Sequence, residues 1–77
     1  MKLNAHQKDT LDRFVLGTIK LAKRRAGQLE ELARGERLLD GLQYVDQMRA
    51  IDQCLQRLKK RGAITFNRDY SAWVLVR

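Results

Sequence analysis

The 77-residue sequence has no proline, one cysteine, one histidine and one serine, and these shortages exclude several classes of site. Cys54 has no second cysteine to pair with, so no internal disulfide can form, and we expect a reducing, cytoplasmic location. One histidine, one cysteine and scattered carboxylates lack the spacing of metal ligands. Because there is no glycine-rich phosphate loop and no pair of inward carboxylates, we expect neither an enzyme nor a cofactor and assign no catalytic residue.

The chain also lacks a long apolar run, so we expect no membrane-spanning segment. Its length suits one small domain over residues 1–77, near the size where a single core is only marginally stable and oligomerisation is a natural supplement. Positive charge is what the sequence has in excess: 16 Lys and Arg against 9 Asp and Glu give a net charge of +7. This balance is typical of proteins that meet phosphates or an acidic partner, although charge alone also serves solubility.

Helical spacing begins near the amino terminus, where Asn4 and Gln7 match a capping box. We expect a helical segment over residues 5–33, formed by one long helix or by two, with Gly27 as the stronger candidate break. Charged side chains, Asp12 among them, are expected mainly on its outer face. The apolar stripe expected to face the core comprises Leu11, Phe14, Val15, Ile19 and Ala22.

Residues 36–61 are expected to form a helix, a turn and a second helix. The first helix would run from Glu36 to Leu42, and Asp46 is a plausible N-cap for the second because its carboxylate would lie near free backbone amides. Apolar residues three and four apart define the core side of the second helix: Met48, Ile51, Leu55 and Leu58. The opposite side carries Arg49, Gln53, Gln56, Arg57 and Lys60, with Lys59 and Arg61 at its margins.

The last third of the chain predicts a β-hairpin over residues 63–77. Gly62 follows three basic residues at the position where a left-handed cap ends a helix. Residues 63–66 and 72–76 are rich in β-branched and aromatic side chains, and the polar stretch between them is typical of a loop. We expect Arg68 and Tyr70 to be exposed in this loop and Trp73 to lie in the core. The predicted fold class is therefore α+β, mostly α with a C-terminal β-hairpin.

The spacing Ile51-x3-Leu55-x2-Leu58-Lys-Lys-Arg-Gly62-Ala-Ile64, followed by a hairpin that ends in Trp-Val-Leu-Val, resembles the third helix and wing of small winged helix-turn-helix DNA-binding domains. The resemblance covers residues 36–77. It implies that helix 46–61 enters the major groove of duplex DNA and that the hairpin loop touches the neighbouring backbone. It also implies a transcriptional regulator, expected as a homodimer because one domain of this size covers few base pairs.

The resemblance gives each polar residue of this helix a role. Arginine can donate two hydrogen bonds to guanine and glutamine can pair with adenine, so the base-contacting candidates are Arg49, Gln53 and Gln56. Phosphate contacts supply most of the salt-sensitive affinity and fix the register on DNA. The phosphate-contact candidates are Arg57, Lys59, Lys60 and Arg61, with Arg68 and Tyr70 on the wing.

A second architecture fits the same apolar spacing. The residues from Leu38 to Leu58 also match a single helix that passes through Gly41, which would pack against a long first helix as an antiparallel helical hairpin capped by the β-hairpin. Such a protein would more naturally bind another protein or dimerise, as a small inhibitor or adaptor. The two hypotheses differ at residues 41–46, where the first requires a turn and the second requires a helix.

Overall fold

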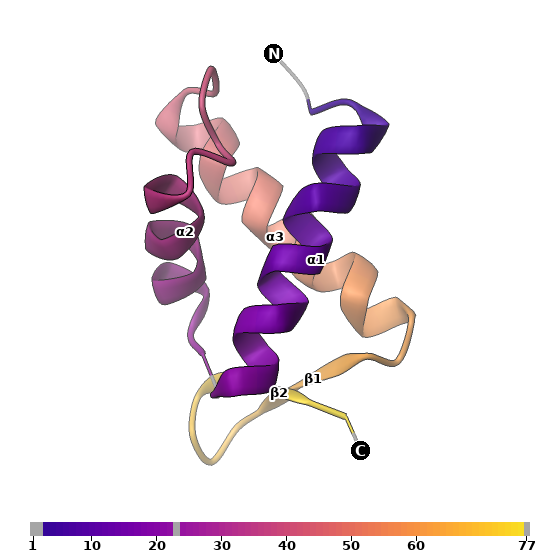
Figure 1. Ribbon diagram of the computed structural model, residues 1–77. Helices are drawn as coiled ribbons and strands as arrows, with labels where there is room; N and C mark the ends of the chain where they lie inside the picture. The colour runs from indigo at the N-terminus through magenta and orange to yellow at the C-terminus, as the bar shows by residue number, and fades with distance from the viewer. Residues whose placement is uncertain (1–2, 23, 77) are drawn as a thin grey trace.

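A computed structural model describes residues 3–22 and 24–76. Over these residues the chain forms three α-helices followed by an antiparallel β-hairpin (Figure 1). The elements are α1 (Ala5–Leu21), α2 (Ala26–Gly35), α3 (Tyr44–Lys60), β1 (Ile64–Asn67) and β2 (Ala72–Leu75). The predicted α+β class, mostly helical with a C-terminal hairpin, is confirmed.

Helix α1 begins where the sequence predicts. The Asn4 side chain accepts a hydrogen bond from the backbone amide of Gln7 at 2.8 Å, and the Gln7 side chain accepts one from the Asn4 amide at 2.9 Å. These two bonds form the expected capping box and satisfy two amides that have no partner inside the helix. In the predicted stripe, Leu11, Val15 and Ile19 are buried and Phe14 is half-buried, but Ala22 is exposed, which is a correction.

Of the two alternatives for residues 5–33, the structure has two helices, and the expected position of the break at Gly27 is wrong. Helix α1 ends at Leu21, the backbone of Ala22 is extended, and Gly27 lies in the first turn of α2. The cause is a contact distant in sequence: Arg24 donates its backbone amide to the Trp73 carbonyl at 3.1 Å and accepts the Trp73 amide at 2.6 Å. Pairing with β2 therefore interrupts the helical stripe without any local helix breaker.

The predicted helix from Glu36 to Leu42 is also wrong. Helix α2 ends in a Schellman motif, in which Leu38 donates its amide to the Ala33 carbonyl and Arg37 donates to the Arg34 carbonyl, both at 3.0 Å. Arg37 occupies the left-handed position of this motif, with φ of 59°. Gly41 has φ of 84°, so residues 36–41 form consecutive turns instead of a helix.

Helix α3 begins two residues before the predicted N-cap. Gln43 is the N-cap and Asp46 lies in the first turn of the helix, where a carboxylate still stabilises the positive helix end. The Gln47 side-chain amide donates to the carbonyls of Leu39 and Leu42 at 3.3 and 3.2 Å, which ties the preceding loop to the helix. Because the chain turns between α2 and α3, the alternative of one helix through Gly41 is wrong as well.

The predicted stop and hairpin are confirmed. Gly62 has φ of 76°, its amide bonds to the Lys59 carbonyl, and the next amide bonds to the Leu58 carbonyl, so α3 also ends in a Schellman motif. In the hairpin, Phe66 lies opposite Trp73 with ring centroids 5.4 Å apart in an edge-to-face arrangement. Trp73 is buried, as predicted.

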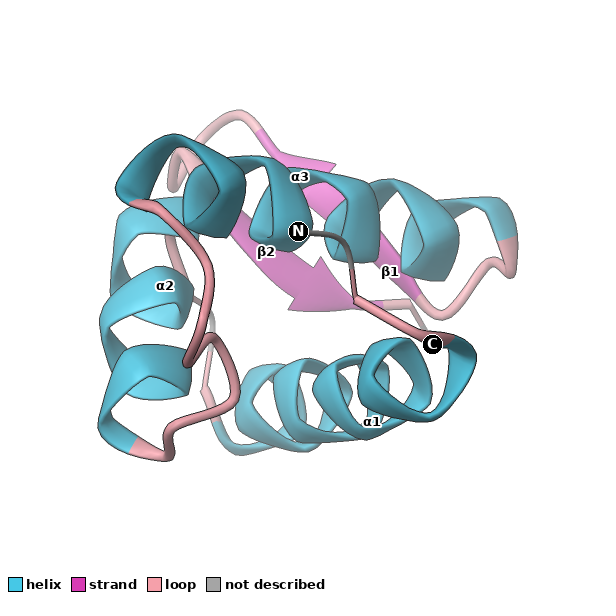
Figure 2. Ribbon diagram, turned by 90° about the horizontal axis from the view of Figure 1, so that it is seen from above, coloured by secondary structure: helices cyan, strands magenta, loops and turns pink. Residues whose placement is uncertain are grey.

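One core holds these elements together. Helix α1 crosses in front of α3, α2 lies to one side of both, and the hairpin closes the end where α1 finishes (Figures 1 and 2). The core comprises Leu11, Val15, Ile19, Leu29, Ala33, Leu39, Ile51, Cys54, Leu55, Leu58, Ile64 and Trp73. This packing covers one side of α3 and leaves the opposite side of the helix to solvent.

Candidate nucleic-acid interface

The outer side of α3 carries an exposed polar stripe. Arg49, Gln53, Gln56 and Lys60 follow one another at intervals of four, three and four residues, so they lie along one side of the helix. All four are exposed, and none of their side chains makes a hydrogen bond or ion pair with another residue in the described part of the chain. Within the folded chain these side chains are therefore available to an external partner. The three predicted base-contacting residues lie together on this stripe.

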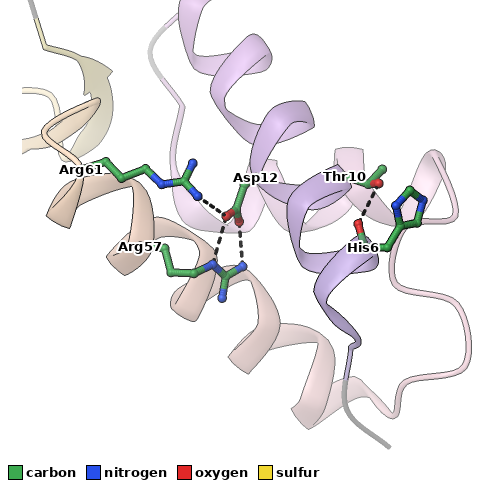
Figure 3. Close-up of polar contacts among 5 residues, drawn as sticks. All are labelled: His6, Thr10, Asp12, Arg57 and Arg61. Atoms are coloured by element: carbon green, nitrogen blue, oxygen red, sulfur yellow. Dashed lines mark hydrogen bonds and ion pairs between the residues drawn. The ribbon is translucent and has the colours of Figure 1, made fainter.

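Arg57 has a partner inside the protein, which corrects the expectation that its guanidinium is available to a phosphate. Its Nε and Nη2 atoms donate to the Asp12 carboxylate of α1 at 3.0 and 2.7 Å (Figure 3). Such a two-point arginine–carboxylate contact is geometrically specific and stronger than a bond between neutral groups. Arg57 is thus assigned to the interface between α1 and α3.

Asp12 itself was expected on the outer face of its helix, and this is wrong because α3 covers it. Its side chain is only 4% exposed. Burial alone would raise its pKa, but the hydrogen bond from Arg57, a second from the Cys54 thiol, and the charges of Arg57 and Arg61 outweigh that effect. The pKa of Asp12 is therefore lowered, and its carboxylate is charged when the protein is folded at neutral pH.

Two further cations at the end of α3 remain accessible. Lys59 and Arg61 are both exposed, and Arg61 extends one Nη2 atom to within 3.8 Å of Asp12 (Figure 3). That distance is longer than a hydrogen bond, and the Arg61 side chain is 60% exposed. Lys59, Lys60 and Arg61 therefore concentrate positive charge where α3 ends, as the sequence predicts.

The loop between β1 and β2 has a defined shape. The Asn67 side-chain oxygen accepts hydrogen bonds from the backbone amides of Asp69 and Tyr70 at 2.9 and 3.3 Å, and Ser71 adopts a left-handed conformation with φ of 50°. Arg68 and Tyr70 are exposed on this loop, as predicted. Seen from above, the loop projects past α3 on the side away from α1 (Figure 2).

Three residues at this surface were missed by the sequence interpretation. Val45 and Asp52 are exposed on α3 beside the polar stripe, and Asp69 is exposed on the hairpin loop. A helical step of about 100° per residue places Val45 and Asp52 on one row next to Arg49 and Gln56, so periodicity alone could have identified both. The surface is therefore basic but contains the carboxylates of Asp52 and Asp69.

Two other groups, Arg34 and Cys54, support the fold. Arg34 at the end of α2 lies 5.3 Å above the Tyr44 ring at the start of α3, a cation–π contact across the connection. Cys54 is buried, and burial together with its hydrogen bond to Asp12 raises the pKa of its thiol, so it is an unreactive core residue.

Among residues 3–22 and 24–76, no group of histidine, cysteine or carboxylate side chains could hold a metal ion. Across the same residues, no helix has the length and apolarity needed to cross a bilayer.

The exposed stripe of α3, the basic end of that helix and the hairpin loop form one candidate interface, which comprises Arg49, Gln53, Gln56, Lys59, Lys60, Arg61, Arg68 and Tyr70. Two of its parts come from one helix and the third from the hairpin that follows it. No family model, curated protein or solved structure matches this chain.

Proposed function

We propose that this protein is a sequence-specific DNA-binding regulator of the winged helix-turn-helix type, which places α3 in the major groove and the β1–β2 loop against the neighbouring backbone. The observation that carries the proposal is the stripe on α3, whose arginine and glutamines have no partner within the described chain and lie on the side away from the core. These are the side-chain types that pair with base edges. A helix face that only contacts water does not require these side-chain types.

The position of the hairpin supports the same proposal. The loop projects on the side of α3 opposite α1, so it would meet the same duplex as the helix (Figure 2). Backbone pairing between Arg24 and Trp73 joins β2 to the segment between α1 and α2, which holds the hairpin against the helices. The connection between α2 and α3, residues 36–43, is longer than the usual helix-turn-helix turn of about 3 or 4 residues. The proposal therefore depends on α3 and the loop.

Charge supports binding to a polyanion. Lys59, Lys60 and Arg61 cluster at the end of α3 and Arg68 lies on the loop, within a chain of net charge +7. Each phosphate that a cation neutralises contributes about 0.9 to the slope of log affinity against log salt. We propose that these four residues contact the phosphate backbone, with Tyr70 beside them, and that the base-contacting residues are Arg49, Gln53 and Gln56.

The test is a titration of duplex DNA by fluorescence anisotropy at several salt concentrations, with a duplex of two helical turns, about 21 base pairs. Replacing Arg49 and Lys60 together by alanine should lower affinity at low salt at least about tenfold and reduce the salt slope by about 1 to 2. The matched control replaces two exposed cations of α1, Arg13 and Lys20, by alanine and removes the same net charge. It should leave affinity within about twofold.

Two results would reject the proposal. One is the absence of duplex binding at low salt by the folded wild-type protein. The other is an equal loss of affinity in the α3 and α1 variants, because this would mean that binding follows net charge and not the proposed face. Either result would favour a protein partner, docked through the helices, as the function to pursue.

A further inference from the structure

Asp52 is an exposed carboxylate on the outer side of α3, where its neighbours are mainly basic or amide-bearing. The other carboxylate of the helix, Asp46, is half-buried in the first turn. Asp52 is exposed one helical turn before Gln56 and three residues after Arg49, and its carboxylate has no hydrogen bond or ion pair with another residue in the described part of the chain. Together with Met48, Ile51 and the first residues of α2, it lines a shallow groove between α2 and α3. A free carboxylate at this position repels phosphates, so it weakens binding to DNA in general.

Val45 is the second unusual residue on this side. It lies in the first turn of α3, seven residues before Asp52 and four before Arg49, and its side chain is 57% exposed. Residues four and seven apart lie on one side of a helix, so Val45, Arg49 and Asp52 would meet the same groove of a duplex. An exposed valine offers no hydrogen bond, and the group on DNA that it complements is the methyl of thymine.

We propose that Asp52 and Val45 determine base preference: Asp52 accepts a hydrogen bond from the N4 amino group of a cytosine, and Val45 contacts the methyl group of a thymine. This inference rests on the proposed function and extends it to a base composition for the target. The carboxylate is the one side-chain type on this row that only accepts hydrogen bonds, and cytosine N4 is the donor that carboxylates recognise in the major groove. Asp52 thus lowers non-specific affinity and raises specificity.

The experiment is a selection of bound duplexes from a random-sequence pool, performed with wild type, Asp52→Asn and Val45→Ala, followed by sequencing. Wild type should enrich a motif with one position at which cytosine is preferred about tenfold and a nearby position at which thymine is preferred. Asp52→Asn keeps the size of the side chain but can donate to adenine, so the cytosine preference should be lost or replaced by adenine. Val45→Ala should lose only the thymine preference.

Two direct titrations complete the test. Against the unselected random pool, Asp52→Asn should bind at least about threefold more tightly than wild type because a repulsive charge is removed. The charge-matched control Glu31→Gln, on the exposed side of α2, should stay within about twofold of wild type. On the selected duplex, replacing the preferred thymine by deoxyuridine should weaken wild type about three- to fivefold, the scale expected for one buried methyl, and leave Val45→Ala unchanged.

The inference is overturned if the variants select the same motif as wild type, or if Asp52→Asn and Glu31→Gln change affinity for the random pool equally. In both cases the protein binds DNA and the proposed function stands without this base assignment. If the folded wild-type protein recovers no duplex at all, the proposed function fails, and the base assignment fails with it.

Discussion

Removing either partner of the Asp12–Arg57 pair should destabilise the fold, and the two losses should be unequal. Asp12 is 4% exposed, whereas the Arg57 side chain is 31% exposed and can turn toward water when its partner is lost. In Arg57→Met the buried carboxylate keeps the hydrogen bond from the Cys54 thiol and the charge of Arg61, at 3.8 Å, so we expect a loss of about 3 kcal/mol, the lower end for a broken buried pair. In Asp12→Leu the remaining cation is partly solvated, and we expect about 1 to 2 kcal/mol.

The double variant, with both Asp12→Leu and Arg57→Met, makes the argument testable as a thermodynamic cycle. It removes both charges and fills the site with apolar groups, so its free energy of unfolding should lie within about 1 kcal/mol of wild type. The assay is urea unfolding at neutral pH, followed by helical circular dichroism, with equal slopes required across the variants. The exposed pair of Asp9 and Arg13, 3.1 Å apart on α1, is the control, and its alanine variants should cost less than about 0.5 kcal/mol.

Two outcomes would refute this reasoning. If Asp12→Leu costs as much as Arg57→Met or more, burial of the carboxylate does not control the energetics. If the coupling energy of the cycle is below about 0.5 kcal/mol, the pair behaves like an exposed surface pair, in spite of its two-point contact.

Three further predictions concern pH and the helix ends. Because the pKa of Asp12 is lowered by folding, its stabilising contribution is complete above its ordinary pKa of 3.8 and is lost as pH falls through the lower pKa of the folded state. The free energy of unfolding should therefore fall less steeply with decreasing pH in Asp12→Leu than in wild type. Gly62→Ala should lower the melting temperature by an amount equivalent to about 1 kcal/mol, since the backbone there has φ of +76° while an added Cβ meets no atom within 4 Å. Arg37→Gly should raise the melting temperature by an amount equivalent to about 0.5 to 1 kcal/mol, because Arg37 occupies the same left-handed position after α2. An unchanged melting temperature in either variant would contradict the account of both helix ends.

The parts of the fold that were predicted correctly depend on signals within a few residues of one another. The capping box of Asn4 and Gln7, the left-handed stop at Gly62 and the strand composition around Trp73 each act locally, and each is confirmed. The break between α1 and α2 depends instead on backbone pairing of Arg24 with Trp73, 49 residues later. No local pattern contains that contact, so periodicity alone left a continuous helix open as an alternative to two helices.

The helix predicted from Glu36 to Leu42 was wrong for a different reason. The same Schellman geometry closes α2 and α3, but glycine occupies the left-handed position only after α3. After α2 that position belongs to Arg37, while Gly35 lies two residues earlier, inside the helix. Because arginine and not glycine occupies this position, the turns at residues 36–41 have no glycine at their first left-handed residue, although the hydrogen bonds are the same.

The candidate interface was predictable in outline because helical spacing separates the exposed side of α3 from its buried side. The exception is Met48, which was expected on the core side and is 49% exposed. What spacing could not provide is the partner of each charge. Arg57 belongs to the basic run of α3 in sequence but bonds to Asp12 of α1, so it contributes to holding the two helices together and not to the charge available outside. The cations left for a polyanion are displaced toward the end of α3 and the hairpin loop, while the middle of the helix keeps arginine, glutamine and Asp52. On this surface, general attraction and discrimination between bases would come from different segments, so variants at the end of α3 should change the salt dependence and variants in its middle should change the preferred sequence.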